Sequence, residues 1–261
     1  MNQLWEQPNR LAILPIAVAM GIVAIWLLTL ALEPGSRAAV LLLDYHAIPP
    51  PDYPLHYPFS IQNLMHLLLF VGLGEIYCRW RTVCREEALL AAGFLPESYE
   101  VVLQSHDLPP IRKAVAQRYD AEHGFLPSLI DLAILQFLAS RSVDQTVSVL
   151  NSSLELLAHR VDLRYSMLRY LVWLIPTIGF IGTVIGISLA LKMIDPGAAE
   201  QPLGEIAQAL GVSFYTTLVA LGESAILVLL LNLVQAREER AVNHAGHYTL
   251  KNLINRLYAG G

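Results

Sequence analysis

The stretch IPTIGFIGTVIGI, residues 175–187, lies inside a long apolar run and therefore predicts a helix. It nevertheless opens with a proline and carries three glycines at steps of three or four residues: Pro176, Gly179, Gly182 and Gly186. Such residues weaken helices in water, but between helices in lipid small residues permit close packing. The stretch therefore predicts a membrane-spanning helix with one smooth face.

The composition extends this interpretation to the whole chain. Hydrophobic residues make up 55% of the 261 residues and charged residues only 15%, whereas soluble domains average about 25% charged residues. A spanning helix takes about 20 residues. The apolar segments of suitable length are 11–32, 61–77, 168–193 and 206–236. The sequence predicts an all-α membrane protein with four transmembrane helices, and the net charge of −5 gives no indication of nucleic-acid binding.

Lysine and arginine residues in the loops predict orientation, because cytoplasmic loops carry the excess of positive charge. The 33–60 loop contains Arg37 alone, and the 193–205 loop contains neither residue type. The 79–167 segment and the 237–261 tail both carry several arginines. Both termini and the 79–167 segment are therefore expected in the cytoplasm.

This topology predicts a division of the chain into four parts. They are a pair of peripheral transmembrane helices (1–78) with a proline-rich outer loop (33–60), a cytoplasmic helical segment (79–167), a second pair of transmembrane helices (168–236) and a cytoplasmic tail (237–261). Long helices are expected to extend from the membrane into the cytoplasm.

Two helix starts are predicted inside the 79–167 segment. Ser128 is placed to cap a helix over 128–141, and Ser142 with Gln145 is placed to form a capping box for the next helix. No glycine or proline then follows until Pro176. The second helix is therefore expected to run without interruption into the third span.

The fourth span repeats the small-residue pattern of the third. Two adjoining faces carry its small and hydroxyl-bearing residues: Ser213, Thr217, Ala220 and Ser224 on one, and Thr216, Ala220 and Glu223 on the other. Threonine hydroxyls offer oxygen ligands without charge. The stripes of the two spans would either line a gap for another helix, water or an ion, or simply pack helix against helix, and spacing leaves both open.

Ionisable side chains in the apolar segments are the other candidates for function. Glu223 lies near the centre of its span, where a carboxylate is costly and either faces a cavity or ties two helices together. His66 in the second span is predicted to form an interhelical hydrogen bond. Glu75 precedes Arg79 by four residues, which predicts a local ion pair.

Motifs for catalysis or cofactor binding do not emerge. The sequence contains no phosphate-binding glycine loop, no zinc-protease motif and no nucleophile elbow. Cys78 and Cys84 fit no common zinc or redox spacing, and the pair His244 and His247 is a weak indication of a metal site. The chain is therefore not expected to be an enzyme, and no cofactor or metal is expected.

Two segments resemble the signatures of one known family. The run from Pro176 to Gly186 resembles the Pro-x-x-Gly-x-x-Gly-Thr-x-x-Gly signature of the MotA/TolQ/ExbB proton channel family. The segment QALGVSFYTTLVALGESAI, residues 208–226, resembles the second signature helix of that family. In this comparison Thr183 falls on the signature threonine, and Thr216 and Thr217 fall on the paired threonines.

The resemblance implies an ion-conducting subunit of a motor in the bacterial inner membrane, driven by the ion-motive force. It implies a homopentamer around two copies of a single-span partner similar to MotB, ExbD or TolR, in which a membrane aspartate carries the ion. The ion is expected to be a proton, with sodium left open, and its path is expected to include Thr183, Thr216, Thr217 and Glu223. The pore lining and packing of the partner helix are expected to use Pro176, Gly179, Gly182, Gly186, Ser213, Ala220 and Ser224.

The sequence also departs from the family pattern. Four spans resemble flagellar stators, but the 33–60 loop is longer and richer in proline than in those proteins, and Val219-Ala220 stands where Tyr-Gly is frequent. Whether the motor would drive flagellar rotation, an outer-membrane process or something else stays open. The alternative is a non-conducting membrane scaffold whose stripes pack a partner helix.

Overall fold

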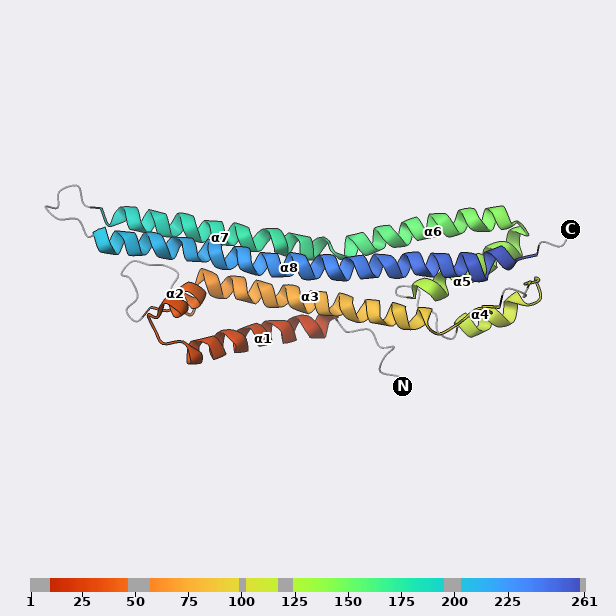
Figure 1. The fold of residues 1–261 in the computed structure, drawn as a ribbon, viewed down its shortest axis with the longest axis horizontal. Helices are drawn as coiled ribbons and strands as arrows, with labels where there is room; N and C mark the ends of the chain where they lie inside the picture. The colour runs from red at the N-terminus through yellow and green to blue at the C-terminus, as the bar shows by residue number, and fades with distance from the viewer. Residues whose placement is uncertain (1–9, 47–56, 99–101, 117–123, 195–202, 259–261) are drawn as a thin grey trace. The chain divides into compact units, whose positions relative to one another are not determined.

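The computed structural model describes residues 10–46, 57–98, 102–116, 124–194 and 203–258. In this part of the chain the regular structure is helical and no strand occurs. The helices are α1 (Arg10–Ala31), α2 (Arg37–Leu43), α3 (Ile61–Leu90), α4 (Leu108–Ala116), α5 (Phe125–Ser140), α6 (Val143–Arg164), α7 (Ser166–Lys192), α8 (Leu203–Asn252) and a short 3-10 helix at Ile254–Arg256 (Figure 1).

The predicted all-α membrane architecture is confirmed. Four helical stretches are long and apolar enough to cross a membrane: Ala12–Ala31, Ile61–Leu90, Val143–Lys192 and Ala209–Arg256. With its 50 residues, α8 is about 75 Å long at about 1.5 Å per residue. Because a bilayer core is only about 30 Å thick, a large part of this helix extends beyond it.

The chain divides into two compact units. The spanning unit comprises Asn9–Tyr77 and Met167–Leu231, and therefore contains α1, α2, most of α3 and α7, and the first part of α8. The insert unit comprises the described residues within Cys78–Ser166 and Asn232–Gly261, and contains the end of α3, α4, α5, α6 and the last part of α8.

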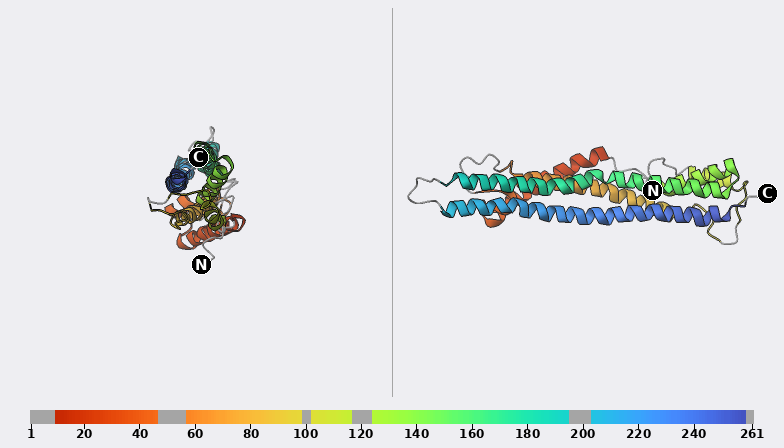
Figure 2. Two further views of the ribbon diagram at one scale, coloured as in Figure 1. Left: turned by 90° about the vertical axis from the view of Figure 1, so that its right-hand side faces the viewer. Right: turned by 90° about the horizontal axis from the view of Figure 1, so that it is seen from above.

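In the spanning unit, glycines set the helix contacts. A Cβ atom at Gly74 of α3 would lie 2.6 Å from the Cβ of Ala17 in α1. A Cβ atom at Gly72 would lie equally close, at 2.6 Å, to a methyl group of Leu227 in α8. Helix α3 is thus in close contact with α1 on one face and with α8 on the other, while α7 runs beside α8 (Figures 1 and 2).

In the insert unit, α5 packs on α4 and α6, and α6 packs on the last part of α8, where Leu154 fits against Gly246. The α5 start differs from the prediction, because the helix begins at Phe125 and Ser128 lies within its first turn. The physical reason is the Glu86 carboxylate, which accepts a hydrogen bond from the Phe125 N–H at 2.9 Å. The Glu86 side chain therefore caps the start of α5, which the sequence predicted for Ser128.

The other two helix predictions in this segment have different outcomes. The cap at Ser142 is confirmed, since its hydroxyl accepts a hydrogen bond from the Gln145 N–H at 3.3 Å. The predicted uninterrupted helix is wrong by one residue, because α6 ends at Arg164 and α7 begins at Ser166. The intervening Tyr165 is fully buried and donates its hydroxyl to Glu238 at 2.7 Å.

Candidate functional site

The proline of the signature segment creates an unpaired carbonyl that the neighbouring helix satisfies. Pro176 lies inside α7 and has no N–H, so the carbonyl of Val172 four residues earlier loses its helical partner. The Ser224 hydroxyl of α8 donates to this Val172 carbonyl at 3.0 Å. In lipid, where water cannot replace the missing donor, such a compensation is required, and it fixes α7 against α8 at this level.

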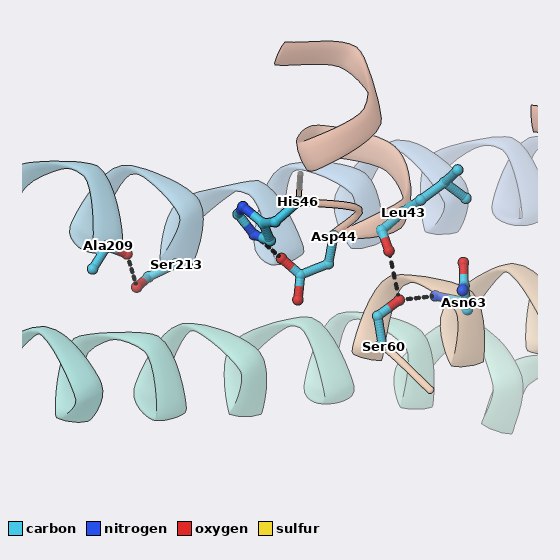
Figure 3. Close-up of polar contacts among 7 residues, drawn as sticks. All are labelled: Leu43, Asp44, His46, Ser60, Asn63, Ala209 and Ser213. Carbon is cyan, nitrogen blue, oxygen red and sulfur yellow. Dashed lines mark hydrogen bonds and ion pairs between the residues drawn. The ribbon is translucent and has the colours of Figure 1, made fainter. Parts of the chain in front are cut away.

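The glycine stripe of α7 lies directly against the small residues of α8. A Cβ atom at Gly179 would lie 2.4 Å from the Cβ of Ala220, and one at Gly186 would lie 2.1 Å from the Ser213 hydroxyl oxygen. Real Cβ atoms do not approach so closely, so glycine is required at both positions. The Ser213 hydroxyl itself donates to the Ala209 carbonyl of its own helix at 2.8 Å (Figure 3).

This close approach brings three threonine hydroxyls together between the two helices. The Thr183 hydroxyl lies 2.5 Å from that of Thr217 and 3.0 Å from the Ser213 carbonyl oxygen. The Thr216 hydroxyl lies 2.9 Å from the same carbonyl and 3.1 Å from that of Gly179. The Thr217 hydroxyl lies 3.2 Å from the Gly179 carbonyl. We call these three side chains and two carbonyls the hydroxyl cluster.

The chemistry of the hydroxyl cluster follows from its donors and acceptors. Each hydroxyl supplies one proton, and a carbonyl can only accept. The cluster therefore has more acceptor than donor capacity and carries no charge. Thr183 and Thr216 are buried, whereas Thr217 is half-buried at the edge of the helix contact. Such a group can accept a proton or contribute oxygen ligands to a small cation.

The structure shows the predicted small residues in contact within one chain. Gly179, Gly182 and Gly186 are buried against α8 of the same chain. Pro176 leaves the Val172 carbonyl without its helical donor, and the Ser224 hydroxyl of α8 donates to that carbonyl. Lining of a pore and packing of a partner helix stay predictions for these residues.

Glu223 has a partner that the sequence did not predict. Its Oε1 forms a short contact with Nδ1 of His66 in α3, and both residues are buried, with 6% and 9% of their surfaces exposed. The other ring nitrogen of His66, Nε2, lies 2.8 Å from the Leu42 carbonyl oxygen at the end of α2. The prediction that His66 forms an interhelical hydrogen bond is confirmed. The sequence contained an indication of this pair, because ionisable side chains within apolar spans usually pair with one another.

A second group of buried polar side chains lies where α2 ends and α3 begins, and the sequence did not single it out. The Ser60 hydroxyl donates to the Leu43 carbonyl at 2.9 Å and accepts from the Asn63 N–H at 3.2 Å (Figure 3). Asp44 is buried and pairs with His46 at 2.9 Å. Polar residues in the first turn of an apolar helix were the overlooked indication.

Comparison with known proteins agrees with the signature helices. Residues 122–246 match the model of the MotA/TolQ/ExbB proton channel family. The chain belongs to the MotA/TolQ/ExbB family. The match begins just before α5 and ends within α8, so it contains the hydroxyl cluster and Glu223 but not His66. Neither a curated protein nor a solved structure matches the chain.

Membership narrows the class of function. This is a family of membrane proton channels, whose members are transport proteins rather than enzymes and work with partner proteins. The four apolar helical stretches agree with a multi-pass membrane protein. No group of three or more metal-binding side chains occurs among the described residues.

Proposed function

We propose that this chain is the ion-conducting subunit of a motor that the ion-motive force drives across a bacterial inner membrane. The transported ion is a proton, with sodium as the alternative. The observation that carries the proposal is the hydroxyl cluster, because its threonines Thr183, Thr216 and Thr217 lie within the residues that match a proton channel family and resemble its signature threonines. A hydroxyl can accept one proton while donating another, so it passes protons without holding charge.

The proposed assembly has five copies of the chain around two single-span partner helices similar to MotB, ExbD or TolR. Both termini of the chain lie in the cytoplasm. In this assembly, neighbouring copies or lipid would cover the large apolar side chains that α7 and α8 expose: Trp173, Phe180, Val184, Phe214, Leu218 and Leu221. A carboxylate on the partner helix would exchange its proton at the edge of the hydroxyl cluster, where Thr217 is half-buried.

Isosteric removal of single hydroxyls tests the proposal. The experiment measures proton flux into liposomes that contain the full chain with its co-purified partner. Thr217→Val and Thr183→Val keep the side-chain volume but remove the hydroxyl, and they are expected to lower flux at least about tenfold, the effect of a barrier raised by about 1.4 kcal/mol. Retention of normal flux in both variants would refute the proposal.

Thr177→Val is the matched control for these substitutions. Thr177 lies on the same helix, but its hydroxyl donates to the Trp173 carbonyl of its own helix at 2.8 Å. Among the described residues this hydroxyl makes no hydrogen bond to α8, so this variant should assemble and conduct as the unmodified chain does. A loss of flux in Thr177→Val would show that any missing threonine hydroxyl disturbs the channel.

A non-conducting scaffold is the second candidate function. The observation that favours it is the close fit of Gly179 and Gly186 against α8, which serves packing by itself. A scaffold predicts that Glu223→Gln changes thermal stability and leaves ion-dependent activity unaltered. Flux that disappears in a variant of unchanged stability would exclude this candidate.

A further inference from the structure

The family match does not contain both members of the buried pair formed by His66 and Glu223. Glu223 lies in the matched segment, whereas His66 lies in α3, outside residues 122–246. Both side chains are buried in the spanning unit. An ionisable pair in such a position costs free energy and is kept where it carries ions or protons.

The hydrogen bonds of this pair determine how many protons it holds. A backbone carbonyl can only accept, so the His66 Nε2 at 2.8 Å from the Leu42 oxygen must carry a proton. The second ring nitrogen, Nδ1, faces the Glu223 Oε1 at hydrogen-bonding distance. Without a further proton, two lone pairs would face each other there. One more proton must therefore lie between Nδ1 and Oε1, on whichever of the two atoms holds it.

We propose that His66 and Glu223 form a proton-binding site of the spanning unit, in which one bound proton bridges the two side chains and joins α3 to α8. When the proton leaves, Nδ1 and Oε1 become two acceptors and repel each other. Loss of the proton therefore separates the side chains, and occupancy of the site governs the contact between the peripheral helix and the signature helix.

The free oxygen of the glutamate indicates where the proton enters. Glu223 Oε2 is buried and has no hydrogen-bond partner among the described residues. The same holds for both side-chain polar atoms of Gln62, which lies one turn before His66 on the same face of α3. Buried polar atoms are normally paired with protein or water. The Asn63 Oδ1, on the same turn of α3 as Gln62, is also buried and unpaired, so polar atoms that a proton could use precede the pair on α3.

Other charged side chains do not substitute for either member of the pair. On the parts of α2, α3, α7 and α8 in the spanning unit, and directly after α2, the other acidic, basic and histidine residues are Arg37, Asp44, His46, Glu75, Arg169, Lys192 and Glu205. Asp44 is already paired with His46. Glu75 lies nine residues from His66, which is about 13 Å along a helix. His66 is therefore the ionisable group that pairs with Glu223.

The experiment measures both possible positions of the proton in the full chain, reconstituted in nanodiscs at neutral pH. Nitrogen NMR of histidine-labelled protein reports the protonation of Nδ1, and the signal lost in His66→Gln identifies His66. Infrared difference spectroscopy against Glu223→Gln detects a protonated carboxyl. The expected result is either a protonated Nδ1 or a carboxylic acid band that disappears in Glu223→Gln. A bare Nδ1 together with an ionised Glu223 would overturn the proposal.

Two variants keep this test interpretable. Glu223→Gln can donate its amide N–H to Nδ1, so it should fold like the unmodified chain while its His66 signal becomes that of a neutral ring. Glu75→Gln changes another buried carboxyl of the spanning unit and should leave the His66 signal and the carboxyl band unchanged. A His66 signal that shifts equally in both variants would contradict a specific pair.

The role of this site in transport rests on the proposed function, but its proton occupancy does not. If the spectra show the bridging proton while Thr183→Val and Thr217→Val both conduct normally, the motor proposal fails and the proton site stands. If the spectra show no bridging proton while Thr217→Val abolishes flux, the site fails and the motor proposal stands.

Discussion

At the scale of single residues, Ser224 compensates for the helical hydrogen bond that Pro176 cannot form. Both were predicted to line a pore or pack a partner helix, and the structure shows the Ser224 hydroxyl replacing the hydrogen bond that the proline removes. Spacing could not show this, because it requires knowing that residue 224 lies beside residue 172, 52 positions away.

This explanation gives a double-mutant prediction. Ser224→Ala leaves the Val172 carbonyl unpaired, and it should lower the free energy of unfolding by about 1 kcal/mol. Pro176→Ala restores an N–H that can bond the Val172 carbonyl, so Ser224→Ala should cost much less in that background. Thermal unfolding of the four proteins in detergent measures the coupling. An equal cost of Ser224→Ala in both backgrounds would contradict the explanation.

Some residues of the candidate site could be predicted from the sequence, and contacts between residues distant in the chain could not. The threonines Thr183, Thr216 and Thr217 were identified because they occupy positions in a family signature. The partner of Glu223 was not identified, because His66 is 157 positions away and helical periodicity relates only near neighbours.

At the scale of elements, α7 and α8 lie so close together that a side chain at the contacting glycines of α7 would overlap α8. The sequence predicted the stripe, and in lipid close approach is what drives such helices together. The sequence did not predict which helix the stripe meets. The start of α5 was mispredicted for a related reason, since Glu86 caps it from a position 39 residues away.

Glycine-to-alanine substitutions separate packing from helix propensity. Gly179→Ala places a methyl group against Ala220 and close to the Thr216 backbone oxygen, at 3.1 Å, which can yield only if the helices separate. It should cost about 1–3 kcal/mol of unfolding free energy, as overpacking does. Gly222→Ala on α8 meets nothing within 4 Å and should be neutral or stabilising. Thermal unfolding compares the two, and equal effects would show that the contact is looser than described.

At the scale of the whole molecule, composition and hydropathy were sufficient to predict four spans and an all-helical chain. Lipid forces backbone groups to be paired, and a helix pairs nearly all of them within its own segment, which makes spanning helices predictable from local sequence. Local sequence patterns do not show whether the large apolar side chains exposed on α7 and α8 meet lipid or another copy of the chain. Phe180 and Phe214 are examples, with 64% and 59% of their surfaces exposed.

The assembly therefore provides the last prediction. Lipid can cover these apolar faces as well as another copy can, so exposure by itself does not select between a monomer and a ring. Native mass spectrometry of the chain, purified in mild detergent with any co-purifying protein, measures the copy number directly. Five copies with two of a single-span partner would agree with the proposed motor. A monomer, a dimer or a ring of another size would mean that the glycine and threonine stripes serve packing within one chain, and the scaffold function would then be the better explanation.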